Sequence, residues 1–440
     1  MPQSERLVVP ITGDYECFSD DWRRTDPDLV FYLPKEPPRC SEAVDHVLVE
    51  VTPGGDLLAM WQNGTQADLS DHSVLYTRSS DGGRSWEEPA QIDPPGPKPG
   101  QVACFGFPVI SASGRIYCFY NKGKAVGTTY TTSFLRCKYS DDDGRTWIDG
   151  EIEIPYRHTK YSHPDPKIGA DNVIWQKPIR DANGRHLVGV TRWTPKLKRP
   201  SIQRLADGQI KDFGTDCHCE FLRFENIDMG PEPGDIEVTW LPDDENLLSV
   251  PLTLIPDAPK DLSYCQEPSI VLLPDNRLFT SMRTQNGEIW YTVSHDNGHS
   301  WRVPEPLRFQ DGGDVMLNPV APTPIFKLND GRYLQFLQNH DGFAHGGRGP
   351  TDNDNRGPQF VSVGEFRNNA HQPIWFSEPL LVLDTHKVGV FPFYRSWLSM
   401  YASLTEHNGE RILWYADRKL FGLGRYITDE MLAPLTVPNT

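Results

Sequence analysis

Short apolar runs alternate with polar turns along the whole chain, and one two-strand pattern recurs six times. Each copy has an apolar strand, a Gly/Asn/Asp turn that usually closes on Arg, a second apolar strand and a polar segment. The six second strands read GGDLLAMWQNG, SGRIYCFYNKG, NGRHLVGVTRW, DNRLFTSMRTQ, DGRYLQFLQNH and NGERILWYADR. The chain has no sustained period of 3.6 residues and no long apolar run, so the pattern favours strands and excludes a transmembrane helix.

The spacing of these units predicts the architecture. Their turn residues lie 55 to 92 residues apart, enough for a four-stranded sheet and its loops; they are Asp56, Arg115, Arg185, Arg277, Arg332 and Arg411. One such sheet cannot bury both faces alone, so the sheets are expected to pack radially around an axis. We therefore predict an all-β, six-bladed β-propeller that forms a single domain over residues 1–440. The stretch before His46 and the longest interval leave room for another strand set, so seven blades are the alternative.

A second repeat supports this architecture. Three octapeptides fit Ser-x-Asp-x-Gly-x-x-Trp, namely SSDGGRSW at 79–86, SDDDGRTW at 140–147 and SHDNGHSW at 294–301. In this pattern Ser and Asp can cap a tight turn, Gly supplies a positive φ, and Trp fills the gap beneath the turn. The octapeptides resemble the Asp boxes of the sialidase (neuraminidase) superfamily, and the resemblance extends over nearly the whole chain. It implies a six-bladed propeller with an active site in a pit on the axis, but this superfamily includes hydrolases, lyases and non-catalytic binders.

Composition limits the partners and the compartment. The formal net charge is −17 and the pI is about 5.2, so nucleic acid, which needs a basic face, is not an expected partner. The N-terminal sequence lacks the basic start and apolar core of a signal peptide, so a cytoplasmic protein without membrane contact is expected. The eight cysteines are expected to be free buried thiols. The run Cys217-His218-Cys219 has no second ligand pair at a workable spacing, so no metal or cofactor is expected.

Equal offsets from the six turn residues predict which side chains reach the axis. Ten residues before the turn residues lie His46, Phe105, Trp175, Glu267, Pro322 and Tyr401. Six or seven residues after them lie Gln62, Asn63, Asn121, Lys122, Thr191, Arg192, Arg283, Thr284, Gln338, Asn339, Asp417 and Arg418. A purely structural axis has no need of this mixture of acidic, basic, amide and aromatic groups, so the ring is predicted to carry a site.

Two segments of this ring resemble catalytic segments of sialidases. QEPSIVLLPDNRLFTSMRT resembles the segment with the Glu that partners the nucleophile and a following clamp arginine, which implies these roles for Glu267 and Arg283. MYASLTEHNGERILWY resembles the segment with the nucleophilic Tyr, which implies that role for Tyr401. A phenol partnered by a carboxylate can attack an anionic sugar with less repulsion than a carboxylate nucleophile, and arginine binds carboxylates bidentately. The resemblance places the general acid in the loop QADLSD, at Asp68 or Asp71.

One position departs from the sialidase pattern. Sialidases have their first clamp arginine in an Arg-Ile-Pro sequence at the head of the first blade, whereas DHVLVEV places His46 there. Candidates for the third arginine are Arg348 and Arg356 in HGGRGPTDNDNRG, and Arg192 is a further source of positive charge. A histidine and a tyrosine across the pit, with arginines nearby, also fit β-elimination of a uronic acid. In this respect the chain is similar to propeller lyases that act on rhamnosyl-glucuronate linkages.

The other ring residues suit sugar recognition. Aromatic side chains can stack on sugar faces, and amide or basic side chains can bind hydroxyl or anionic groups; they are Phe105, Trp175, Trp193, Asn63, Asn121, Lys122, Asn339, His340 and Arg418. We predict an exo-acting glycoside hydrolase that releases a terminal acidic sugar from an oligosaccharide or glycoconjugate. His46 would bind the substrate or carry a proton in this reaction. A polysaccharide lyase and a non-catalytic glycan-binding propeller are the alternatives.

Overall fold

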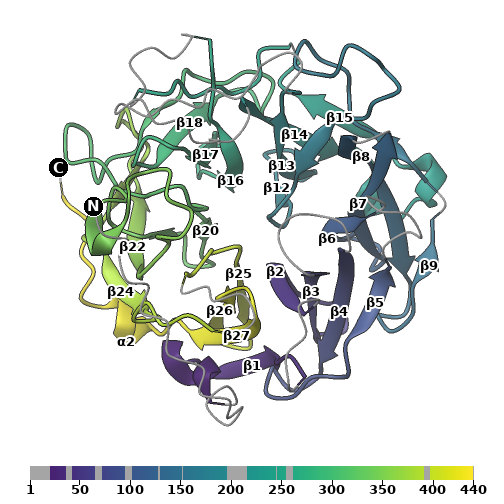
Figure 1. Cartoon of the computed structure of the whole chain (residues 1–440), viewed down its shortest axis with the longest axis horizontal. Coiled ribbons are helices and arrows are strands. Elements are labelled where there is room, and N and C mark those ends of the chain that lie inside the picture. The colour runs from purple at the N-terminus through teal and green to yellow at the C-terminus, as the bar shows by residue number, and fades with distance from the viewer. Residues whose placement is uncertain are drawn as a thin grey trace.

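Six antiparallel β-sheets of four or five strands surround a central axis in the computed structural model (Figure 1). The structure describes residues 20–35, 42–64, 72–94, 102–126, 129–150, 152–195, 216–243, 245–253, 261–390 and 397–439. The fold is the six-bladed propeller that the repeat spacing predicts, and each repeat supplies the innermost strand of one sheet and the strand paired with it. We call these sheets blades 1 to 6 in chain order.

The first three blades are each built from consecutive strands. Blade 1 contains β2 (Ala43–Val51), β3 (Leu57–Gly64), β4 (Ser73–Ser79) and β5 (Ala90–Asp93). Blade 2 contains β6 (Ala103–Ile110), β7 (Ile116–Val126), β8 (Thr129–Ser140), β9 (Ile148–Asp149) and β10 (Ile154–Pro155). Blade 3 contains β11 (Asp171–Val173), β12 (Ile179–Arg180), β13 (His186–Trp193), β14 (Cys217–Phe224) and β15 (Val238–Leu241).

The second half of the ring follows the same scheme until the last blade. Blade 4 contains β16 (Gln266–Leu272), β17 (Leu278–Arg283), β18 (Trp290–Ser294) and β19 (Glu305–Pro306). Blade 5 contains β20 (Ile325–Lys327), β21 (Tyr333–Leu337), β22 (Gln359–Phe366), β23 (Ile374–Phe376) and β24 (Leu380–Leu383). Blade 6 contains β25 (Ser403–His407), β26 (Glu410–Asp417), β27 (Phe421–Tyr426) and β1 (Leu29–Tyr32).

Helices in the described residues are short. They are the 3-10 helices η1 (Asp21–Thr25), η2 (Ile227–Met229), η3 (Pro233–Asp235) and η4 (Ala344–Gly346), and the α-helix α2 (Asp429–Leu432). None of the helices in the described ranges is long and apolar enough to cross a membrane.

Residues 20–35, in the described part of the stretch before His46, close the ring instead of adding a seventh blade. β1 pairs antiparallel with β27, with Leu29 opposite Gly424, so the first described strand completes the last blade (Figure 1). A buried arginine reinforces this seam, because Arg418 donates to the carboxylate of Asp21 at 2.8 Å and to its carbonyl at 2.7 Å. The six-blade count from the repeats is therefore confirmed.

The hydrophobic core lies between neighbouring blades. Phe31 of blade 6 contacts Trp61 of blade 1 edge-on, with ring centroids 5.5 Å apart, and Trp414 at 6.2 Å. Phe119 of blade 2 packs against Phe224 of blade 3 at 4.7 Å. Since each interface buries apolar faces from two sheets, a blade is stable only within the ring.

The Asp boxes form the tight turns that their residues predict. In the first box Ser79 Oγ bonds Asp81 Oδ1 at 2.8 Å and accepts the Gly83 N–H at 2.8 Å. Asp81 also accepts the Ser85 N–H at 2.9 Å. Hydrogen bonds from Ser85 are the main reason that the pKa of Asp81 falls to about 2. Gly83 has a φ of +89°, which confirms the need for glycine at the fifth position.

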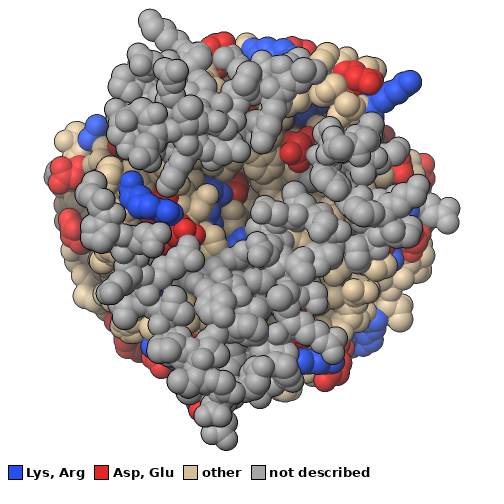
Figure 2. Space-filling model, viewed as in Figure 1, with Lys and Arg blue, Asp and Glu red and all other residues tan. Residues whose placement is uncertain are grey.

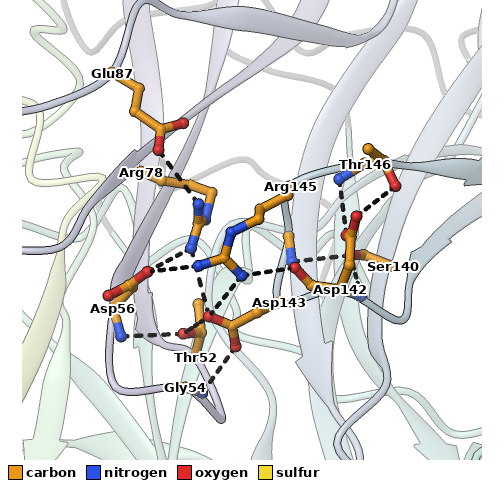
Figure 3. A network of polar contacts seen from close by, with 11 residues as sticks. Thr52, Gly54, Asp56, Arg78, Glu87, Ser140, Asp142, Asp143, Arg145 and Thr146 are labelled. Atoms are coloured by element: carbon orange, nitrogen blue, oxygen red, sulfur yellow. Dashed lines mark hydrogen bonds and ion pairs between the residues drawn. The ribbon is translucent and has the colours of Figure 1, made fainter.

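The second Asp box also fastens blade 2 to blade 1 (Figure 3). Asp143 accepts the Thr52 hydroxyl and the Gly54 N–H, both at 2.8 Å. Arg78 bridges Asp56 and Asp143. The other boxes repeat this role: Asn297 in blade 4 bonds Asp181 in blade 3 at 2.8 Å, and Arg84 in blade 1 pairs with Glu410 in blade 6 at 2.6 Å. The boxes are thus staples between neighbouring blades.

Candidate active site

A repeated irregularity in the innermost strands positions three of the predicted ring residues. The register of β2 shifts between Asp45 and Leu48, and equivalent shifts occur in β6 and β16. The residues inside these shifts, His46, Phe105 and Glu267, have φ values of +51°, +54° and +52°. Left-handed backbone at a non-glycine residue costs about 1–2 kcal/mol and is concentrated at functional sites. The equal offsets from the turn residues therefore selected three residues that lie in equivalent, strained bulges.

Glu267, Arg283 and Tyr401 meet in one buried hydrogen-bonded group. Tyr401 donates its hydroxyl hydrogen to Glu267 Oε1 at 2.8 Å. Arg283 Nη1 donates to the same carboxylate oxygen at 2.8 Å and to the Tyr401 hydroxyl oxygen at 3.0 Å. Glu267 and Arg283 come from paired strands of blade 4, whereas Tyr401 precedes β25 of blade 6. The sequence resemblance assigned these three residues to one site, and the fold brings them into direct contact.

The surroundings keep Tyr401 protonated and Arg283 charged. Burial, followed by the Glu267 carboxylate, raises the pKa of Tyr401 well above its usual range. Burial alone would lower the pKa of Arg283, but Glu267 and the nearby phenols raise it above its usual range. Glu267 Oε2 is buried and has no hydrogen-bond partner in the described part of the chain. The resting group therefore pairs a neutral phenol with a carboxylate that can receive its proton.

His46 stacks on Tyr401 as a neutral ring. The two rings lie 4.2 Å apart at an interplanar angle of 22°, and Phe105 contacts His46 edge-on at 4.8 Å. Burial is the largest cause that lowers the pKa of His46, to about 4. Asp45 opposes this shift, but it is itself bound to Lys419, whose ammonium lies 5.2 Å from the Tyr401 ring. His46 Nδ1 is buried without a hydrogen-bond partner among the described residues, so a free imidazole nitrogen lies beside Tyr401.

Arg356 is the second arginine of the site. Its side chain is buried and lies over the Trp397 ring at 4.9 Å. Both Arg356 Nη2 and Arg283 Nη2 donate to Asn353 Oδ1, the latter at 3.3 Å. Burial and the charge of Arg283 lower the pKa of Arg356. Of the two candidates for the third clamp arginine, Arg356 joins the group, whereas half-exposed Arg348 pairs with Asp352.

Trp175 supports Tyr401 from the side. Their rings contact edge-on at 5.9 Å, and Trp175 is fully buried, so it offers no ring face to a sugar. Trp193 is half-buried and packs against the cluster that contains Phe105 and Val173. Of these three predicted aromatic residues, only Trp193 keeps part of its side chain exposed, since Phe105 is buried as well.

Two predicted anion binders have structural partners instead. Arg192 is fully buried in blade 3, where it pairs with Glu220 through Nε at 2.8 Å. Arg418 is fully buried at the ring seam and pairs with Asp417 and Asp21. Arg418 has two carboxylate partners, and Arg192 shares Glu220 with Arg157. Both predicted anion binders are thus held in buried ion pairs outside the Tyr401 group.

The polar residues predicted to bind hydroxyl groups are spread over several local networks. Lys122 pairs with Asp93 at 2.6 Å, and Asn63 donates to the Ala43 carbonyl at 3.1 Å. Asn121 accepts a hydrogen bond from Tyr156. His340 accepts the Gly342 N–H and contacts the Gly357 carbonyl at 3.2 Å. Asn339 is exposed with a φ of +52°, and it alone of this set presents an open side chain.

The predicted general acids, Asp68 and Asp71, lie outside the described residues. Asp171 is an acidic residue that the repeat offsets did not select. It lies two residues before Val173 on β11, hence on the same strand face, and Val173 packs with Phe105. Its half-buried side chain has a pKa raised to about 7 by burial. A carboxyl group that holds its proton near neutral pH is suited to proton donation.

The run Cys217-His218-Cys219 lies in β14, where its side chains contact neighbouring residues. The ring of His218 bonds Ser249 Oγ at 2.8 Å and Asp216 Oδ2 at 3.1 Å. Both cysteines are buried as free thiols. Within the described ranges, no group of three or more His, Cys, Asp or Glu residues is placed to hold a metal ion.

Three contributors to the site were not found from the sequence. Asn353 lies in the irregular loop between β21 and β22, where the repeat gives no phase. Lys419 lies one residue beyond the offsets used, and Asp45 is next to His46 but one residue out of register. Asp45 and Lys419 neutralise each other beside Tyr401. The signal available for both was adjacency to a ring position.

Charges of both signs are interspersed over the described surface. Figure 2 shows Lys or Arg atoms next to Asp or Glu atoms around this face and near its middle. The net charge of −17 therefore does not produce one uniform acidic face in this view.

Comparison with known proteins agrees with the fold. The BNR repeat-like domain family matches residues 55–381. A Dyadobacter fermentans protein of unknown function has 14% identity and a TM-score of 0.58, over 90% of this chain and 96% of that one. The intramolecular trans-sialidase of Ruminococcus gnavus, solved with oseltamivir carboxylate, has 14% identity and a TM-score of 0.55, over 89% and 96%.

A larger sialidase contains the same fold as part of its chain. Trypanosoma rangeli sialidase, solved with the inhibitor DANA, has 10% identity and a TM-score of 0.53. The match covers 93% of this chain but 59% of that one. No curated protein matches the chain. Because the family match covers most of the sequence and the structural matches share the ring, the chain belongs to the BNR repeat-like domain family and has the six-bladed propeller fold of sialidases.

Proposed function

We propose that the protein is an exo-acting glycoside hydrolase of the sialidase type that releases a terminal acidic sugar. The observation that carries this proposal is the 2.8 Å hydrogen bond from the Tyr401 hydroxyl to Glu267 Oε1. A tyrosine that donates to a buried carboxylate next to an arginine is an arrangement suited to covalent catalysis on an anionic sugar. The sialidases among the structural matches support a glycan as the partner.

The proposed reaction proceeds in two displacements. Tyr401 Oη attacks the anomeric carbon while its proton passes to Glu267, and the bond to the leaving-group oxygen breaks. That oxygen takes a proton from a carboxylic acid, for which Asp68, Asp71 and Asp171 are the candidates. Water then attacks the anomeric carbon, and the bond from that carbon to Tyr401 Oη breaks. The water gives one proton to the carboxylate that the acid has become, and Glu267 returns its proton to the phenolate.

A specific observation favours a lyase as the second candidate. His46 is neutral at pH 7 and has a buried unpaired Nδ1 next to Tyr401, as a base that removes the C5 proton of a uronic acid requires. Tyr401 would then protonate the leaving oxygen, and Arg283 and Arg356 would neutralise the carboxylate. The products of the two reactions differ, because elimination creates a carbon–carbon double bond conjugated to the carboxylate.

The test is a screen of acidic oligosaccharides with the wild type and Tyr401→Phe. A hydrolase yields a reducing sugar with the mass of added water, whereas a lyase yields an unsaturated sugar that absorbs near ~235 nm. We expect the hydrolase product with the wild type and only a small residual rate with Tyr401→Phe. An unsaturated product would replace the proposal by the lyase. Binding without turnover by the wild type would identify a glycan-binding propeller.

A further inference from the structure

One amide oxygen lies between the two arginines of the site. Asn353 Oδ1 accepts hydrogen bonds from Nη2 of Arg283, at 3.3 Å, and from Nη2 of Arg356. The Nε atoms of both arginines are buried and lack a hydrogen-bond partner within the described residues. A guanidinium group has five N–H donors. The two arginines therefore keep unused donors around a single neutral acceptor.

The charges around this oxygen are not balanced. Arg283 and Arg356 carry two positive charges and Glu267 carries one negative charge. His46 is neutral at pH 7 because its pKa is about 4, and burial keeps Tyr401 protonated. Among the residues that the structure describes in this group, one positive charge is left without a negative partner. An amide oxygen satisfies hydrogen-bond geometry but supplies no charge, whereas one carboxylate would supply both.

The loop that carries Asn353 is fixed, but the side chain itself is exposed. Asp352 accepts hydrogen bonds from the backbone and side chain of Arg348, at 3.0 Å each. Asn355 Nδ2 donates to two backbone carbonyls of the same loop, at 3.0 Å each. Asn353 is exposed and takes no part in these contacts, so the loop stays fixed when its side chain leaves the arginines. The loop thus presents Asn353 to the arginines as a removable acceptor.

We propose that Asn353 Oδ1 occupies the place of a carboxylate oxygen of the ligand, and that a sugar acid with one carboxylate binds by displacing it. This inference rests on the proposed function and adds to it a specificity-determining residue, Asn353. An anionic ligand gains the charge pairing that the amide lacks, whereas a neutral sugar must break the two hydrogen bonds without that gain. The site therefore selects against the neutral analogue.

The test compares Asn353→Asp, Asn353→Ala and the control Asn369→Asp, which adds the same charge on the exposed turn between β22 and β23. Calorimetric titration would use N-acetylneuraminic acid and glucuronic acid, each beside its methyl ester. We expect Asn353→Asp to bind the acids at least about tenfold more weakly than the wild type, because its carboxylate pairs with both arginines. Asn353→Ala should bind them at least as tightly as the wild type, and Asn369→Asp should match it.

The outcomes separate this inference from the proposed function. Equal binding of an acid by Asn353→Asp and the wild type would overturn the inference alone, as would a tenfold loss in Asn353→Ala. A wild type that binds esters but neither acid would overturn both. Thermal unfolding without ligand gives a second measurement: a carboxylate between two guanidinium groups should make Asn353→Asp more stable than Asn353→Ala. If Asn353→Ala were the more stable variant, the position of residue 353 between the two guanidinium groups would be contradicted.

Discussion

Removing the proton acceptor of Tyr401 tests the proposed chemistry most directly. In Glu267→Gln, the oxygen that accepts the phenolic hydrogen at 2.8 Å becomes part of an amide, which does not take up a proton at ordinary pH. A positioned general base contributes about 10²–10⁴-fold to a rate. We therefore expect kcat to fall by about that factor, which corresponds to roughly 3–5 kcal/mol of transition-state stabilisation.

The same substitution also affects folding, so stability must be measured beside activity. Glu267 is 3% exposed and pairs with Arg283 at 2.8 Å. Breaking a buried ion pair costs about 3–5 kcal/mol when one charge is left alone. The glutamine oxygen still accepts the arginine hydrogen bond, so we expect a loss toward the lower end of that range. Urea unfolding measures this loss, and rates are compared only where circular dichroism shows folded protein.

A double-mutant cycle with Tyr401→Phe separates action through the tyrosine from direct action on the substrate. Glu267 can activate only the hydroxyl that Tyr401→Phe removes, so the double variant should be no slower than Tyr401→Phe alone. The assay is the initial rate on an acidic aryl glycoside at one pH. Losses that add in the double variant would refute the pairing, and so would full turnover by Glu267→Gln.

Two further predictions concern stability. The pKa of His46 is about 4 in the folded protein against about 6.5 unfolded, so between these values the unfolded chain binds more protons and stability rises with pH. Acidification from pH 6.5 to 4 should cost up to roughly 3 kcal/mol that His46→Gln does not lose; identical urea-unfolding curves against pH would contradict this. Asp143→Ala removes the acceptor of Thr52 and Gly54 in the blade 1–blade 2 staple and should cost about 1–3 kcal/mol. Asp141→Ala, a half-exposed neighbour in the same box, is the control and should cost less; equal losses would refute the staple.

The repeat phase predicted positions along the strands better than the partners of side chains. Equal offsets placed His46, Phe105 and Glu267 at equivalent positions, and all three lie in equivalent bulges. The same offsets selected Arg192 and Arg418, which are paired with Glu220 and Asp417. A sequence offset fixes depth along a blade, but successive side chains alternate between faces. A carboxylate partner 28 residues away for Arg192 leaves no local signal.

The two-strand repeat could not predict the parts of the structure that lie outside it or depend on folding. Asn353 lies in a loop fixed by side-chain hydrogen bonds, and such loops have no period to count from. The raised pKa of Asp171 is caused by burial, which exists only once the chain has folded. The alternative of a seventh blade arose because pairing of β1 with β27 joins distant segments, which strand patterns alone do not specify.

The pairing of β1 with β27 also determines when, during synthesis and folding, the candidate site can assemble. Blades 1 to 5 each form from contiguous sequence, whereas blade 6, which Tyr401 enters, needs the last strands and then the return of the first. Glu267 is synthesised well before Tyr401, but the two meet only when that final blade docks. Bringing such distant segments together has an entropic cost, and it can happen only once the strands of blade 6 have been synthesised. In a chain that is still being synthesised, Glu267 therefore lacks its Tyr401 partner. The proposed site is complete only when the ring closes.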